Sequence, residues 1–96
     1  MIIAVDFDGT LQLPDGQANA PLMHALRLKQ RSGDILILWT CRNGTRLAEA
    51  VAFCLKNGLR FNFVNQNPPQ VLKMLGYDPR KIYADLYIDD KAQGFR

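Results

Sequence analysis

The chain has 96 residues, of which 48% are hydrophobic and 22% are charged, and its formal net charge is +3. This length and composition predict one globular domain and argue against a disordered or fibrous chain. The basic residues are scattered along the sequence and form no polybasic tract, so the charge pattern does not favour a nucleic-acid-binding protein.

The cysteines and the N-terminus indicate the cellular compartment. The two cysteines, Cys41 and Cys54, have neither the spacing of a zinc site nor that of a disulfide framework. The apolar run at the N-terminus ends at Asp6, which is too early for a signal peptide or a membrane span. We therefore expect a protein of the reducing cytoplasm that has no membrane partner.

Short apolar runs, typical of buried strands, alternate with amphipathic segments, typical of helices. Proline at a first helical position and glycine after a last one mark the ends of several helices. In chain order we expect a strand over 2–7, a loop over 8–19, a helix from Pro21 to near Gly33, a strand over 35–39, a helix with an apolar stripe from Leu47 to Leu55, a strand over 61–64, a helix capped by Asn67 and ended by Gly76, and a strand over 86–88.

Strands that alternate with helices pair in parallel through right-handed crossovers. The sequence therefore predicts a single α/β domain over residues 1–96. Its expected architecture is a three-layer, Rossmann-like parallel sheet with helices on both faces.

Polar side chains follow three of the predicted strands at the points where these strands end. They are Asp6-Phe7-Asp8-Gly9-Thr10, Thr40-Cys41-Arg42 and Asp89-Asp90. Ligands of open parallel sheets bind beyond the carboxyl ends of the strands, so we expect these residues to share one rim. Clustered carboxylates raise one another's proton affinity unless a cation lies among them. Mg²⁺ is the expected cofactor, because it takes oxygen ligands and shares its coordination with phosphate.

The spacing of Asp6 and Asp8 suggests a reaction. Residues i and i+2 of an extended segment point to the same side, so both carboxylates can face one phosphorus atom. One can attack and form an aspartyl-phosphate, while the other protonates the leaving oxygen and later activates the hydrolytic water. Gly9 permits a tight turn and a close approach of the backbone to a ligand.

At these residues the chain resembles the phosphatases of the haloacid dehalogenase (HAD) superfamily. Asp6-Phe7-Asp8-Gly9-Thr10 matches their DxDGT signature. Thr40, after an apolar strand, is similar to their second motif, and Asp89-Asp90 is similar to their acidic fourth motif. The resemblance covers nearly the whole chain in the order of the family.

The resemblance implies that Asp6 is the nucleophile and a metal ligand. It implies that Asp8 is the general acid/base and binds the metal through its backbone carbonyl. It further implies that Thr40 donates a hydrogen bond to the phosphoryl group, and that Asp89, assisted by Asp90, binds Mg²⁺. Loop residues of these motifs are expected to contact the substrate, Arg42 as a bidentate phosphate ligand: Gly9, Thr10, Cys41 and Arg42.

The third motif of the family is a basic residue that neutralises the nucleophile and the phosphoryl group. This sequence departs from the pattern, because amide residues occupy 65–67, where that residue usually opens a helix. Lys81 resembles a lysine of some small members, yet a continuous strand over 82–88 would place it roughly 20 Å from the site. Lys81 can serve only if that strand is short and the chain before it folds back. Lys73 and Arg42 are the alternatives.

The loop after Asp8 is too short for the cap domain that many HAD enzymes carry, and no other insertion is large enough. The resemblance therefore implies an open-sited phosphatase. Its substrate would be a phosphorylated small molecule or the terminal phosphate of a larger one, so nucleic acid is a partner only as a substrate. Sugar phosphates and nucleotides both stay open.

Other functions share parts of this chemistry. A receiver module also phosphorylates an aspartate beside Mg²⁺, but at the end of its third strand, and here that strand ends in Val64-Asn65. A dehalogenase needs the nucleophile but not Asp8. A catalytically idle HAD-like protein would act through binding or regulation alone, and the intact set of motif residues argues against it.

Two further features have plainer interpretations. A cysteine phosphatase needs an arginine six positions after its nucleophile, and the residue six positions after Cys41 is Leu47. Trp39 and the pair Phe61 and Phe63 are expected to pack in the core rather than to stack on bases.

Overall fold

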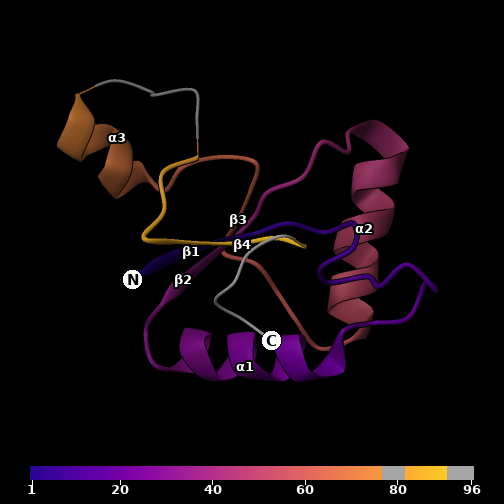
Figure 1. Ribbon diagram of the computed structural model, residues 1–96. Coiled ribbons are helices and arrows are strands. Elements are labelled where there is room, and N and C mark those ends of the chain that lie inside the picture. Colours follow the sequence, from indigo (N-terminus) through magenta and orange to yellow (C-terminus); the bar gives the residue numbers. More distant parts are fainter. Residues whose placement is uncertain (77–81, 91–96) are drawn as a thin grey trace.

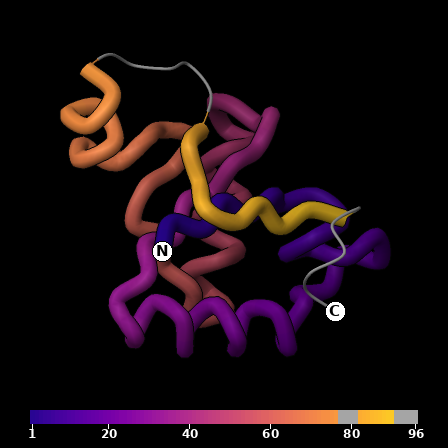
Figure 2. The backbone as a smooth tube through the Cα atoms, turned by 60° about the vertical axis from the view of Figure 1, so that its left-hand side comes forward, coloured from indigo at the N-terminus to yellow at the C-terminus, as the bar shows by residue number. Residues whose placement is uncertain are grey.

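The structure, a computed structural model, describes residues 1–76 and 82–90. The elements in chain order are β1 (Ile2–Val5), α1 (Ala20–Arg31), β2 (Ile35–Leu38), α2 (Gly44–Lys56), β3 (Phe63–Val64), α3 (Pro69–Leu75) and β4 (Leu86–Ile88) (Figure 1). All strand pairs are parallel, and the strand order is β3-β2-β1-β4. Figure 2 shows the segment of β4 beside the N-terminal strand β1.

The helices lie on both faces of the sheet. The chain advances from β1 to β2 to β3 in one direction, so right-handed crossovers put α1 and α2 on one face, and the return to β4 puts α3 on the other. Figure 1 shows α1 and α3 on opposite sides of the sheet. The predicted three-layer, Rossmann-like α/β fold is confirmed, and residues 1–76 and 82–90 contain no cap domain. Within these same ranges, no helix is both long and apolar enough to cross a membrane.

The main core lies between the sheet and the helices α1 and α2. Alternate residues of three strands are buried there together with side chains from both helices: Ile3, Val5, Leu36, Leu38, Ile88, Leu26 and Cys54. On the α3 face, Ala4 and Ile37 are also fully buried. Because β1 and β2 are covered on both faces, their sequences are continuously apolar, as in other parallel sheets.

Several element boundaries differ from the prediction: β2 ends one residue early, at Leu38, and β3 begins only at Phe63. Two further differences have a clear physical reason. The first strand ends at Val5 because the chain turns: the N–H groups of Thr10, Leu11 and Gln12 all donate to the Phe7 carbonyl at 3.0 to 3.2 Å. The N-cap of α3 is Pro68, so the prediction of Asn67 was wrong. The side-chain oxygen of Asn67 instead accepts the N–H of Tyr83 at 2.6 Å, which ties the start of α3 to the chain before β4.

Asn65 joins the end of β3 to the end of β2. Its N–H donates to the Leu38 carbonyl at 2.8 Å, and its side-chain Oδ1 accepts the N–H of Thr40 at 2.8 Å. Its φ of 52° lies in the left-handed region, which asparagine enters more readily than most residues do. Asn65 therefore fixes the backbone of the loop that follows β2.

Asn65→Ala should lower the free energy of unfolding by about 2 kcal/mol, because the Thr40 N–H loses its acceptor and alanine is forced into the left-handed region. Asn65→Gly removes the same hydrogen bond without that steric cost, so this variant should be the more stable of the two. Urea denaturation of the wild type and both variants measures the order. A stability of Asn65→Ala equal to that of the wild type would contradict this account.

Candidate functional site

A pocket lies at the carboxyl edge of the sheet, where β1, β2 and β4 end. Its volume is about 310 Å³, and its lining consists of Asp6, Trp39, Thr40, Cys41, Asp89 and Asp90. β1 lies between β2 and β4. The connection from β1 to β2 crosses one face of the sheet, and the connection that leads to β4 crosses the other face. Open parallel sheets usually bind their ligands at such a point. The structure thus brings together five residues that the sequence nominated.

Asp6 is one of the carboxylates of this lining. Burial raises the pKa of Asp6 above its ordinary value, although the N–H of Phe7, which donates to Asp6 Oδ1 at 2.8 Å, acts in the opposite direction. The nearby carboxylates of Asp8, Asp90 and Asp89 raise this pKa further. A cation among these groups would reverse the effect, so the electrostatics of the pocket favour a bound positive charge.

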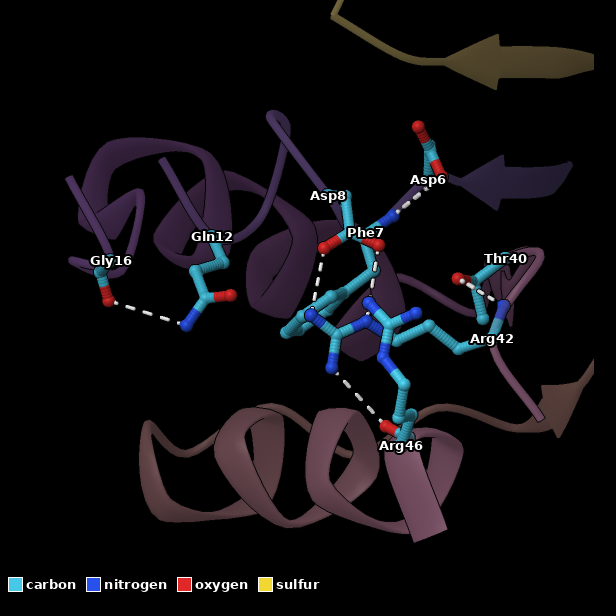
Figure 3. A network of polar contacts seen from close by, with 8 residues as sticks. All are labelled: Asp6, Phe7, Asp8, Gln12, Gly16, Thr40, Arg42 and Arg46. Carbon is cyan, nitrogen blue, oxygen red and sulfur yellow. Dashed lines mark hydrogen bonds and ion pairs between the residues drawn. The ribbon is translucent and has the colours of Figure 1, made fainter. Parts of the chain in front are cut away.

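Asp8 lies outside the pocket lining and pairs with Arg42 (Figure 3). Arg42 Nη2 donates to Asp8 Oδ1 at 2.8 Å, and Arg42 Nε donates to Asp8 Oδ2 at 3.1 Å. The guanidinium also lies 4.7 Å from the centroid of the Phe7 ring, and Nη1 donates to the Arg46 carbonyl at 3.2 Å. The bidentate hydrogen bonds of Arg42 hold the pKa of Asp8 below its usual value.

The two aspartates of the signature point in different directions, as Figure 3 shows. The expected same-side arrangement assumed an extended backbone, but the turn begins at Phe7. The Phe7 ring is buried and packs edge-to-face against Phe53, with ring centroids 5.6 Å apart. This packing places a buried anchor between Asp6 and Asp8, so Asp6 faces the pocket while Asp8 faces Arg42.

Thr40 is nearly buried at the end of β2, and its hydroxyl oxygen accepts the N–H of Arg42 at 3.2 Å. This bond uses an acceptor site of the hydroxyl and not its hydrogen. Gly9 has a φ of 79°, and a Cβ there would lie 3.4 Å from the Cβ of Asp90. Glycine therefore lets the loop after β1 pack closely on the loop after β4. Thr10 is buried and does not line the pocket, so the structure does not bring it to a substrate.

Lys81, the nominated third-motif residue, lies outside the described residues. The strand after it is short, because β4 covers only Leu86–Ile88. The Tyr87 hydroxyl donates to the Ile82 carbonyl at 2.5 Å and accepts the N–H of Ala84 at 3.1 Å, so the chain before β4 folds back along this side chain. The alternative, Lys73, is exposed on α3 and does not line the pocket.

Two residues of the site were not recognised in the sequence. Trp39 was expected in the core, but it lines the pocket and 41% of its surface is exposed, so that prediction was wrong. Alternate residues of a strand share a face, so Ile35 and Ile37 could have placed Trp39 on the face that carries α3. The sequence could not have shown that Trp39 is exposed on that face. Asn65, which holds Thr40, gave no signal beyond its position after a strand.

The oxygen donors present suit Mg²⁺. Asp6, Asp89 and Asp90 line the pocket with carboxylates. In the chain as far as it is described, no group of three or more His, Cys, Asp or Glu side chains has an arrangement that could hold a metal ion. Mg²⁺ commonly binds through one or two carboxylates and keeps several waters, so the donor set fits it better than metals that need a full protein cage.

No family model matches the sequence, and no curated protein matches it at a significant level. A solved structure of a conserved protein from Bacteroides thetaiotaomicron is similar, with 39% sequence identity and a TM-score of 0.79. The similarity covers 100% of this chain and 80% of the Bacteroides chain. With this identity over this length, the chain belongs to the same family as the conserved Bacteroides thetaiotaomicron protein.

Proposed function

We propose that the protein is a Mg²⁺-dependent phosphomonoester hydrolase that works through an aspartyl-phosphate on Asp6, in the manner of the HAD phosphatases that its motifs resemble. One observation carries the proposal: Asp6, Thr40, Asp89 and Asp90 line a single pocket at the carboxyl edge of the sheet. A carboxylate nucleophile, a hydroxyl donor and acids for a cation are what this reaction needs.

In the proposed first step, a carboxylate oxygen of Asp6 attacks phosphorus, and the bond from phosphorus to the leaving oxygen breaks. The N–H of Phe7 already holds Oδ1, which orients the carboxylate and leaves Oδ2 for the attack. The Thr40 hydroxyl donates its hydrogen to a phosphoryl oxygen. When bound, Mg²⁺ would neutralise the crowded carboxylates and polarise the phosphoryl group. Water then attacks phosphorus, which releases phosphate and restores Asp6.

Asp8 is the proposed proton carrier, and Arg42 controls it. The ion pair with Arg42 favours the ionised carboxylate, which cannot donate a proton to a leaving oxygen. A phosphoryl group is a competing bidentate partner for the guanidinium. Transfer of Arg42 from Asp8 to the phosphate would let the pKa of Asp8 rise, so that Asp8 could carry the proton.

A binding or regulatory role without turnover is the second candidate. The observation that favours it is the Asp8–Arg42 pair itself, because it holds Asp8 ionised and directed away from Asp6. In that case Asp6 would at most accept a phosphoryl group that persists, as in a receiver module.

Asp6→Asn should abolish the hydrolysis of a generic aryl phosphate, because an amide oxygen is a poor nucleophile for phosphorus. Phosphate release in the presence of Mg²⁺ measures the effect, and circular dichroism checks the fold. Asp15→Asn, at an exposed loop aspartate, is the matched control and should keep wild-type turnover. Activity retained by Asp6→Asn would refute the nucleophile assignment.

Asp8→Asn should slow both formation and breakdown of the phosphoenzyme by about 10²–10⁴-fold, as expected for lost acid–base help. Rapid-quench measurement of the phosphorylated protein separates the two steps. A rate close to that of the wild type in both steps would exclude Asp8 as the proton carrier, whereas a wild-type phosphoenzyme that forms and does not break down would favour the second candidate.

Removal of Mg²⁺ with EDTA should stop turnover, and added Mg²⁺ should restore it, because the carboxylates around Asp6 repel an approaching phosphate. Circular dichroism in both conditions should agree, since the main core is apolar and distinct from the pocket. Full turnover in EDTA would contradict the metal requirement. Release of halide from a haloacid under those conditions would instead identify a dehalogenase.

A further inference from the structure

We propose that Trp39 and Tyr87 form a stacking platform for the base of a nucleoside monophosphate. The substrate class is then nucleotides rather than sugar phosphates that carry no base. This inference rests on the proposed function, because it assigns the part of the substrate that lies beyond the phosphoryl group.

The position of Trp39 is the first observation. Tryptophan is the largest apolar side chain, yet 41% of Trp39 is exposed instead of being buried in the core. Trp39 lines the same pocket as Asp6 and Thr40. Its backbone N–H donates to the Val5 carbonyl at 2.9 Å, which ties its backbone to the strand that precedes the proposed nucleophile. An exposed indole in the wall of a pocket offers a flat apolar surface to a ligand.

The second observation is the contact between Tyr87 and Trp39. The Tyr87 ring meets that of Trp39 edge-to-face, with centroids 5.8 Å apart and an interplanar angle of 68°, and 42% of Tyr87 is exposed. Two hydrogen bonds fix its hydroxyl group, which donates to the Ile82 carbonyl and accepts from the Ala84 backbone N–H. The edge-to-face pair covers only one face of one ring, so a further planar group can stack on it. The platform is therefore held in place before a ligand arrives.

The arrangement of these groups specifies the ligand. Trp39 follows β2 and Tyr87 belongs to β4, and these are the two strands that flank β1 and Asp6. The pocket volume of about 310 Å³ lies at the small end of the range for small-molecule sites. If the phosphate of the ligand binds at Asp6 and Thr40, the rest of the ligand lies beside the indole of Trp39. A nucleobase fits this position because every base has a π-face that can stack on the indole. A sugar phosphate without a base would leave the aromatic surface uncovered.

A mononucleotide fits better than a nucleic-acid strand. The net charge is only +3 and the basic residues form no tract along which a phosphate backbone could lie. One base and one phosphate account for the aromatic and polar parts of the pocket.

Because Trp39 is the single tryptophan of the chain, its fluorescence reports directly on the platform. We would titrate the Asp6→Asn variant, in Mg²⁺, with adenosine 5′-monophosphate and with ribose 5-phosphate. The nucleotide should quench the fluorescence and bind about tenfold more tightly, as one base–aromatic stack allows. Equal affinities, or nucleotide binding without quenching, would overturn the platform.

Two variants in the same background test the ring itself by calorimetry. Trp39→Leu should weaken adenosine 5′-monophosphate about tenfold and leave ribose 5-phosphate unchanged, while Trp39→Phe should keep part of the nucleotide affinity. An equal loss for both ligands would mean that Trp39 supports the fold of the pocket and would refute stacking. If Trp39→Leu does not fold, the comparison of the two ligands on the parent protein still decides.

The proposed function can fail separately. Nucleotide quenching without hydrolysis of any phosphomonoester by the wild type would refute the phosphatase and keep the platform. Hydrolysis with equal kcat/KM for ribose 5-phosphate and adenosine 5′-monophosphate would keep the phosphatase and refute the platform.

Discussion

The pairing of β1 on both of its edges is the constraint on which the pocket depends. β1 is hydrogen-bonded to β2 and β4 and is buried on both faces, so the residue after it has little freedom. The Asp6 N–H donates to the Ile88 carbonyl at 2.8 Å, and the Trp39 N–H donates to the Val5 carbonyl at 2.9 Å. These two bonds continue the sheet by one residue on each side. The loops after all three strands therefore start at the same level and share one pocket.

This convergence has an electrostatic cost that defines the chemistry of the site. The sheet crowds Asp6, Asp89 and Asp90 together, and burial adds to the effect, so the pKa of Asp6 rises. Arg42 is paired with Asp8, and neither residue lines the pocket, so this positive charge does not offset the carboxylates there. The charge that remains in the pocket is the physical reason to propose a cation there, and it is independent of the motif resemblance.

The fold and part of the site followed from local sequence, because they depend on local rules. Continuous apolar runs marked β1 and β2, and residues placed directly after strand ends had to meet at one edge. The direction of Asp8 did not follow, because it depends on a turn anchored by Phe7 in the core and on an ion pair with Arg42, 34 positions away. The exposure of Trp39 did not follow either. It depends on how the rest of the fold covers that face, which no pattern around residue 39 encodes.

The incomplete cover of this face bears on the proposed choice of substrate. α3 has 7 residues, whereas α1 has 12 and α2 has 13, so the face of the sheet that carries α3 is covered less than the other. By alternation with Ala4, Asp6 points to this thinner face, and so do Trp39 and Tyr87. On this face Trp39 and Tyr87 are both exposed, beside the proposed nucleophile. In the proposed enzyme, whose described residues include no cap, the aromatic rings beside the carboxylate on this face are the groups that would select the substrate.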